Sequence, residues 1–318
     1  MEVNLSTTSR WCKKHPENAL LGPTGKLMGK KVALVLGGGG ARGLAHIGVI
    51  RGLIRNGFEI TSVAGTSMGA VVGGMYAAGK LDEYETWMRS LSKFDVFSLI
   101  DFNFSSEGII KAERVLNKIK KFIPDRLIEE LPIRFAAVTT DILKGEEVVL
   151  TRGSLFEAIR ASIAIPMLIT PLKKNDTLFV DGGILNPVPV NRVYRNDGDI
   201  LVAVDVNSFV PFHQQPEEVP EPGFFEQFHL WRLSNFHHKS GKNPPSGKKE
   251  SPGYFHLMVD SSNLMLAQIA RLTFDKNPPD LLIEISKDAC SIFDFYKTSE
   301  IIELGEKATA ECLEKWRK

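Results

Sequence analysis

The stretch Val63-Ala64-Gly65-Thr66-Ser67-Met68-Gly69-Ala70 decides how this chain folds. It has the form of a short buried strand that runs directly into a helix, with a serine at the corner. Gly65 and Gly69 flank that serine, where the two backbones approach too closely for a side chain. The spacing predicts a nucleophile elbow that exposes the hydroxyl of Ser67 at a helix N-terminus, where negative charge is favoured. The same pattern also fits an ordinary corner in which Ser67 is only an N-cap.

A second glycine-rich corner lies upstream of this elbow. The apolar run Val32-Ala33-Leu34-Val35-Leu36 is typical of a parallel strand that is buried on both faces. It ends at Gly37-Gly38-Gly39-Gly40-Ala41-Arg42-Gly43, and a helix follows whose apolar residues recur at helical spacing: Leu44, Ile47, Ile50 and Ile54. Two strand–helix units in succession, with no hairpin signal between them, predict a three-layer α/β/α sandwich with a mostly parallel central sheet.

The rest of the chain continues this alternation and indicates one domain. We expect helices between residues 82 and 123, a helix capped by Ser154, a helix over about 257–274 and a closing helix from Ser299. Further strands are expected over 133–138, 147–151, 177–180, 200–206 and 280–285. Residues 1–30 have no clear periodicity and are interpreted as an N-terminal leader, so the domain covers residues 31–318. Seven prolines interrupt residues 207–253, which we interpret as an irregular insertion.

Composition argues against several classes of protein. The formal net charge of +1 gives no basis for nucleic-acid binding. The three cysteines are far apart and lack C-x-x-C spacing, so we expect reduced thiols and neither a disulfide framework nor a zinc site. No window approaches the roughly 18 apolar residues that span a membrane, and the polar N-terminus does not form a signal peptide. We therefore expect a cytoplasmic protein without a metal or an organic cofactor. The oligomeric state stays open.

The glycine loop over residues 37–43 fits three kinds of site at first sight. A dinucleotide site would need an acidic residue at the end of the second strand, but Gly65-Thr66-Ser67 stands there. A phosphate-binding P-loop would need a Gly-Lys-Ser or Gly-Lys-Thr sequence, and none follows. The remaining use is an oxyanion hole, in which backbone N–H groups face the oxygen that becomes negative. Arg42 holds the shape of this loop, adds positive potential to it, or is a solvated residue of the first helical turn.

A serine nucleophile also needs a base. His46 lies inside the first expected helix, and the other histidines outside the leader lie in or beside the insertion: His213, His229, His237, His238 and His256. Asp181 is the better candidate, because it follows a buried strand at the edge where parallel sheets place their sites. Gly182 and Gly183 after it allow another group to approach. An Asp-Gly-Gly sequence also suits a turn or a helix cap, and the same turn role is expected for Asp141.

The glycine loop, the Ser67 elbow and Asp181-Gly182-Gly183, in this order, resemble the patatin-like phospholipases, particularly their bacterial members. The resemblance runs from about residue 32 to residue 206 and includes Arg160-Ala161-Ser162-Ile163-Ala164-Ile165-Pro166. It implies a serine acyl hydrolase of lipid esters, with Ser67 as nucleophile and Asp181 as the base of a Ser-Asp dyad. It also implies an oxyanion hole formed by Gly38, Gly39 and Gly40. The supporting residues that it implies are Arg42, Gly43, Gly65, Gly69, Gly182 and Gly183.

Two other functions remain compatible with the sequence. A histidine-dependent thioesterase or esterase would use His213 or His256 as its base. A non-catalytic, lipid-binding regulator on the same fold would not need Ser67 at all. Substitution of these residues distinguishes the three possibilities.

Residues 224–249 are a candidate contact with a membrane, because a lipid esterase takes its substrate from an aggregate. Phe224, Phe228 and Trp231 fall at helical spacing, and a run of lysines follows at 239, 242, 248 and 249. Aromatic residues beside a basic run suit shallow insertion among anionic headgroups, which would place the protein at the inner face of the membrane. The same aromatic residues could instead pin the insertion onto the core.

Overall fold

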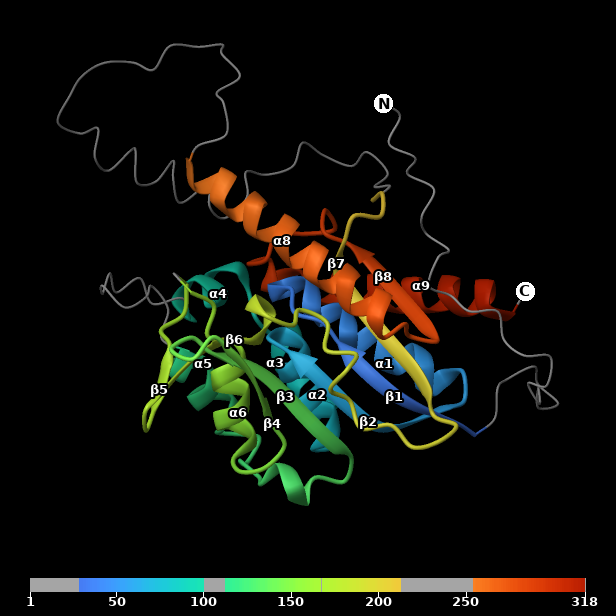
Figure 1. Ribbon diagram of the computed structural model, residues 1–318, viewed down its shortest axis with the longest axis horizontal. Helices are drawn as coiled ribbons and strands as arrows, with labels where there is room; N and C mark the ends of the chain where they lie inside the picture. Colours follow the sequence, from blue (N-terminus) through green and yellow to red (C-terminus); the bar gives the residue numbers. More distant parts are fainter. Residues whose placement is uncertain (1–28, 100–111, 167, 213–253, 318) are drawn as a thin grey trace, which may run out of the picture.

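A computed structural model of the protein describes residues 29–99, 112–166, 168–212 and 254–317 (Figure 1). Its centre is an eight-stranded sheet with the order β5-β6-β3-β2-β1-β7-β8, and β4 pairs with β3 beside this path. The strands are β1 (Lys30–Leu36), β2 (Phe58–Thr66), β3 (Arg134–Asp141), β4 (Glu146–Leu150), β5 (Leu172–Lys174), β6 (Thr177–Asp181), β7 (Ile200–Ser208) and β8 (Leu281–Ser286).

The parallel part of the sheet places the ends of five strands at one edge. Parallel pairs join β3 to β2, β2 to β1, β1 to β7 and β7 to β8. The register brings Leu36, at the end of β1, beside Gly65 of β2 and Val204 of β7. The last residues of β3 instead pair antiparallel with β4 and β6. The glycine loop and Ser67 therefore lie at the same carboxyl edge, the edge at which open α/β sheets bind their ligands.

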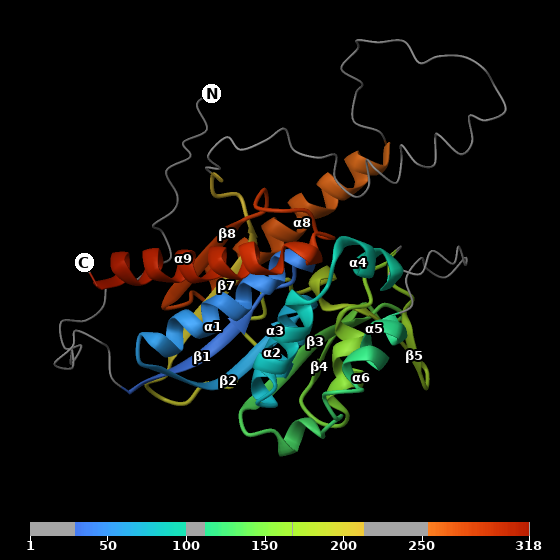
Figure 2. The same cartoon turned by 180° about the vertical axis from the view of Figure 1, so that it is seen from behind.

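Helices cover the two faces of the sheet unequally. They are α1 (Ala45–Arg55), α2 (Met68–Ala77), α3 (Leu81–Arg89), α4 (Lys93–Leu99), α5 (Ala112–Ile119), α6 (Leu155–Ser162), α8 (Tyr254–Lys276) and α9 (Thr298–Arg317), with short 3-10 helices η1 (Gly40–Leu44), η2 (Ile128–Glu130), η3 (Gly182–Ile184) and η5 (Phe295–Lys297). The views from front and back show α8 on one face and α1, α2, α3 and α9 on the other (Figures 1 and 2).

The two hydrophobic cores follow from the alternation of side chains along β1. Val32, Leu34 and Leu36 point into the larger core, which α1, α2, α6 and α9 complete. Ala33 and Val35 point into the smaller core, where Ala270 and Phe274 of α8 pack. A strand that is buried on both faces must be apolar at every position, which explains why β1 reads as a continuous run rather than an alternating one.

Most of the expected elements are confirmed, and Ser154 caps α6 by accepting a hydrogen bond of 3.0 Å from the N–H of Glu157. The expected boundary of the insertion was wrong, because β7 continues through Asn207 and Ser208. Lys30, expected in the leader, begins β1, and the short strand β5 was not expected. The leader over residues 1–28 and the proposed membrane contact at 224–249 lie outside the described residues.

Candidate active site

Ser67 occupies the single residue between β2 and α2. Its backbone has φ 54° and ψ −124°, and among the described residues only Asn175 is another non-glycine with positive φ. Such a conformation costs about 1–3 kcal/mol and persists only when its surroundings impose it. A Cβ atom on Gly65 would lie 2.3 Å from the carbonyl oxygen of Gly69, and one on Gly69 would lie 2.1 Å from that of Leu36. The expected elbow is therefore present, and sterics require glycine on both sides of it.

A buried serine on α6 holds the backbone of this elbow. The N–H of Ser67 donates to Oγ of Ser162 at 2.9 Å, and that hydroxyl donates in turn to the carbonyl of Val138 at 2.6 Å. Ser162 is fully buried. Its single proton is therefore committed to Val138, and its lone pair receives the amide of Ser67. Sequence reasoning assigned no role to Ser162, although the stretch Arg160–Pro166 is part of the resemblance.

Asp181 ends β6 and caps η3. Its Oδ1 accepts a hydrogen bond of 2.7 Å from the N–H of Gly183, and its own N–H donates to the carbonyl of Ala164 at 2.9 Å. Its Oδ2 is buried and has no partner with normal hydrogen-bond geometry. Burial raises the pKa of Asp181 to about 6, while the Ser67 hydroxyl and the Gly183 N–H both act to lower it. The carboxyl group of Asp181 is thus close enough to the Ser67 hydroxyl for that hydroxyl to lower its pKa.

The glycine loop approaches Ser67 and contains two amides without a described acceptor. The N–H of Gly38 donates to the carbonyl of Pro187 at 3.0 Å, so the expected use of this amide in an oxyanion hole conflicts with the bond it already makes. No described residue accepts a hydrogen bond from the N–H of Gly39 or Gly40. A Cβ atom on Gly38 would lie 3.2 Å from Cβ of Ser67, which shows how closely the loop approaches the serine. Gly40 needs glycine for its φ of +58°.

Arg42 anchors this loop from behind. Its guanidinium donates to Oδ1 of Asn207 at 2.6 Å and to the carbonyls of Lys287 and Cys290, both at 3.2 Å. Asn207 in turn donates to the carbonyl of Gly38 at 2.5 Å. Burial lowers the pKa of Arg42, and the field of Asp205 is among the opposing effects. These contacts fit the expected role of holding the shape of the loop, and Arg42 is buried rather than solvated.

The remaining glycines of the site allow close packing. A Cβ atom on Gly43 would meet the side chain of Met68 at 2.4 Å, so Gly43 seats the loop against the start of α2. A Cβ atom on Gly182 would lie 2.2 Å from the carbonyl of Val138. One on Gly183 would lie 2.9 Å from Oδ1 of Asp181. These contacts place the loop, the elbow and the aspartate around one small region.

The histidine and acidic alternatives lie elsewhere or have other partners. His46 is fully buried, its Nε2 lies 2.8 Å from the carbonyl of Gly37, and burial lowers its pKa to about 4. It is therefore a neutral donor that supports the glycine loop. Asp141 accepts from the N–H of Leu143 at 3.1 Å, which confirms its turn role. The side chain of His256 and residues 213, 229, 237 and 238 lie outside the described part of the chain.

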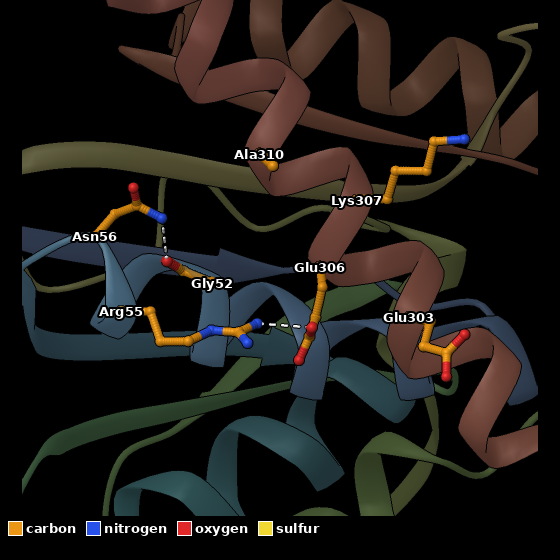
Figure 3. Close-up of a pocket in the computed structure, with 7 residues that line it drawn as sticks. All are labelled: Gly52, Arg55, Asn56, Glu303, Glu306, Lys307 and Ala310. Atoms are coloured by element: carbon orange, nitrogen blue, oxygen red, sulfur yellow. Dashed lines mark hydrogen bonds and ion pairs between the residues drawn. The ribbon is translucent and has the colours of Figure 1, made fainter.

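Other kinds of site find no support in the described ranges. They contain no group of three or more His, Cys, Asp or Glu side chains that could hold a metal. In the same ranges, no helix combines the length and hydrophobicity needed to cross a bilayer. A surface groove of about 530 Å³ lies between the end of α1 and α9, and Arg55 and Glu306 form an ion pair of 2.7 Å across it (Figure 3). It has no lining residue in common with the site around Ser67.

Comparisons with known proteins identify the family of the chain. Residues 34–194 match the family model described as patatin-like phospholipase. An uncharacterised NTE family protein of Mycobacterium tuberculosis is 33% identical over 332 residues, which cover 89% of this chain and 91% of that protein. The lysophospholipase NTE1 of Phaeosphaeria nodorum is 30% identical over 291 residues, 89% of this chain but 18% of that protein. A crystal structure of VipD from Legionella pneumophila is a distant match, with a TM-score of 0.45 and 15% identity over 98% of this chain and 72% of that one. The chain belongs to the patatin-like phospholipase family, a family of lipid ester hydrolases.

Proposed function

We propose that this protein is a serine acyl hydrolase that cleaves fatty-acyl ester bonds of phospholipids or lysophospholipids through a Ser67–Asp181 dyad. The observation that carries the proposal is the pairing of two unusual groups. Ser67 has a strained backbone at a strand–helix corner. Asp181 has a buried oxygen without a hydrogen-bond partner, and its carboxyl group lies close enough to the Ser67 hydroxyl to interact with it. Strain and an unsatisfied buried charge are both costly, and enzymes keep such features where the chemistry needs them.

The first half of the reaction follows from these positions. Oδ2 of Asp181 takes the proton of the Ser67 hydroxyl as Oγ bonds to the acyl carbon. The carbonyl oxygen becomes negative, and the free N–H groups of Gly39 and Gly40 donate to it. When the tetrahedral intermediate collapses, the bond to the alcohol oxygen breaks and that oxygen receives the proton from Asp181. The products are a free alcohol and an acyl group on Ser67.

The second half uses the same groups with water as nucleophile. Asp181 takes a proton from water, whose oxygen bonds to the acyl carbon, and the oxyanion again lies against the glycine amides. Collapse breaks the bond to Oγ, which regains a proton from Asp181, and a fatty acid leaves. A base whose pKa of about 6 lies close to neutral pH is mostly ionised yet still accepts a proton readily. No metal or organic cofactor takes part in this scheme.

Asp181 is a described ionisable group beside Ser67, whereas the histidine-dependent alternative depends on His213 or His256, whose side chains lie outside the described residues. The one histidine whose side chain the structure describes near the loop, His46, is kept neutral by burial and donates to Gly37. A lipid-binding regulator would have no use for a buried carboxylate oxygen without a hydrogen-bond donor, Oδ2 of Asp181, beside a strained serine. Residues 224–249 are still proposed as a peripheral membrane contact.

A substrate panel with matched variants tests the proposal. Phospholipid, lysophospholipid, triacylglycerol and acyl-CoA are compared with wild type, Ser67→Ala and Asp181→Asn. We expect ester cleavage by wild type, loss in Ser67→Ala and a fall of roughly 10²–10⁴ in Asp181→Asn. A fluorophosphonate should label one site, in the peptide that contains Ser67. Labelling elsewhere, or a folded Asp181→Asn variant with full activity, contradicts the dyad.

A further inference from the structure

Among the exposed apolar side chains, Leu143, Leu185 and Phe209 lie in segments that directly follow elements at the carboxyl edge of the sheet, and Phe94 lies in α4. Phe94 is 81% exposed, Leu143 67%, Phe209 51% and Leu185 39%. We call these four residues the apolar rim. Scattered exposed apolar residues are normal on protein surfaces, so what matters is where these four lie.

Three residues of the apolar rim lie close in the chain to groups of the candidate active site. Leu143 lies in the turn after β3, two residues beyond Asp141, and Leu185 directly follows η3, which Asp181 caps. Phe209 follows β7, two residues after Asn207, whose amide holds the carbonyl of Gly38.

Phe94 closes the rim through the segment beyond β8. It belongs to α4, and the neighbouring Val96 packs with Phe293 and Ile292. The carbonyl of Ile292 accepts a hydrogen bond of 2.9 Å from the N–H of Ala41 in the glycine loop. Three members of the rim are therefore a few residues from a group that builds the site, and Phe94 is linked to the glycine loop through Val96 and Ile292.

Lysines stand beside three of the four rim residues. Lys144 follows Leu143, Lys93 precedes Phe94, and Nζ of Lys287 lies 5.2 Å from the ring centre of Phe209. Lys93 and Lys297 lie 5.4 and 5.9 Å from the ring centre of Tyr296, which packs beside α4. A lysine can lay its carbon chain along apolar surface while its ammonium group reaches a phosphate.

Carboxylates offset much of this positive charge. Lys287 pairs with Asp288 at 2.6 Å, Lys144 lies 3.7 Å from Asp141, and Lys297 lies 3.9 Å from Asp294. The described part of this edge therefore has no strong positive field to attract an anionic surface. Any attachment here must depend mainly on burial of the apolar side chains.

We propose that the apolar rim inserts into the surface of a zwitterionic phospholipid bilayer and so brings the site against its substrate. This inference rests on the proposed lipid hydrolase function. A protein partner or a second copy seated on the rim would cover the site, whereas a lipid surface supplies the substrate. Separate apolar side chains also suit insertion among lipids, whereas a stable protein interface buries a continuous area of about 800 Å² per partner.

Binding and hydrolysis are measured separately to test this. In the inactive Ser67→Ala background, phosphatidylcholine vesicles are sedimented with the protein and with a rim variant, Phe94→Ser/Leu143→Ser/Leu185→Ser/Phe209→Ser. The matched control is Ile54→Ser/Leu127→Ser, which changes apolar residues of similar exposure (46% and 42%) next to the amino ends of β2 and β3. In the active background, the same changes are compared on vesicles and on a water-soluble short-chain ester.

We expect the rim variant to lose roughly tenfold or more in vesicle partitioning. Partitioning of wild type should change little between about 0.1 M and about 0.5 M salt. The rim variant should lose vesicle hydrolysis in parallel but keep turnover of the soluble ester. The control variant should keep both activities.

The proposal is overturned if wild type does not bind these vesicles, or if the folded rim variant binds as wild type does. It is also overturned if light scattering shows that the rim holds a dimer that the variant breaks. Failure of the hydrolase function alone would remove turnover of the soluble ester from wild type and leave the sedimentation result intact.

Discussion

The backbone N–H of Ser67 donates to the hydroxyl of Ser162, and the two residues are 95 positions apart in the chain. This bond ties the strained elbow between β2 and α2 to the last residue of α6, which is itself fixed to β3 through the carbonyl of Val138. An elbow with φ 54° has no local reason to be stable. Ser162 supplies part of the tertiary support, so we regard it as a positioning residue for the nucleophile.

Ser162→Ala should therefore lower turnover by misplacing Ser67. The substitution leaves a buried N–H unpaired, which costs about 1–3 kcal/mol of stability. We expect a lower kcat on a soluble ester with little change in KM, and slower labelling of Ser67 by a fluorophosphonate. The matched control is Ser62→Ala, because Ser62 is also buried and its hydroxyl donates to the carbonyl of Tyr194, far from the site. Equal losses of kcat in both variants would mean that only general stability is affected.

The activity should rise with pH through the pKa of Asp181. Burial raises that pKa to about 6, and only the ionised carboxylate can accept the proton of Ser67. We expect kcat/KM to fall about tenfold for each pH unit below 6 and to level off above it. Rates with a water-soluble ester between pH 4.5 and 8 measure this, after a check that the fold survives. An inflection near pH 4 would mean that the working carboxylate has an ordinary pKa and is not this buried one.

Stability should show the opposite dependence on pH. The pKa of Asp181 is about 6 in the folded protein and lies near its ordinary value of 3.8 when unfolded, so between these values the folded state holds the extra proton. Wild type therefore loses stability as pH rises from about 4 to about 6, by up to an amount on the order of 2–3 kcal/mol. Asp181→Asn lacks this loss and should unfold at higher temperature at pH 8 but not at pH 4. Thermal unfolding at both pH values checks this; a destabilised variant at pH 8 contradicts it.

The sequence predicted best what depends on neighbouring residues. The strand before Ser67, the glycines on both sides of it and the cap at Ser154 all act within a few positions, so their patterns are local. Asp181 could be paired with Ser67 because strands of a parallel sheet end at one edge, and because of the family resemblance.

The missed features are contacts between distant segments. Asn207 was assigned to the insertion, since the prolines that follow it outweighed the apolar run before it. Nothing local indicates that its amide holds Gly38, or that the N–H of Gly38 is already used by Pro187. The hydrogen bond from Ser67 to Ser162 depends in the same way on how α6 returns to the sheet.

A compensating pair of substitutions should test how tightly the glycine loop is held. A Cβ atom on Gly39 would lie 2.4 Å from Cγ2 of Val206 in β7, a separation that forces a shift of the loop. We expect Gly39→Ala to lower both turnover and melting temperature. Val206→Ala removes the opposing methyl groups, so the double variant should recover much of the turnover. The single Val206→Ala change controls for the cavity, and a double variant no better than Gly39→Ala would mean that the alanine acts in another way.

Arg42→Lys tests whether the guanidinium fork is what holds the loop in position. Arg42 reaches Asn207 and the carbonyls of Lys287 and Cys290 at once, and an ammonium group, a compact charge without the planar fork, cannot span all three. The freed carbonyls and Asn207 would let Gly38 and its neighbours move away from Ser67. We expect kcat on a soluble ester to fall by roughly tenfold or more, because losing or displacing an oxyanion donor lowers turnover by a factor of about 10²–10³.

Arg195→Lys is the matched control. Arg195 also joins a backbone carbonyl, that of Asp199, to the side chain of Asp280, but it does so at the opposite edge of the sheet. That pair is partly exposed, so its loss should cost less than about 1 kcal/mol and leave turnover unchanged. If Arg42→Lys keeps wild-type kcat, the loop holds its shape without this anchor.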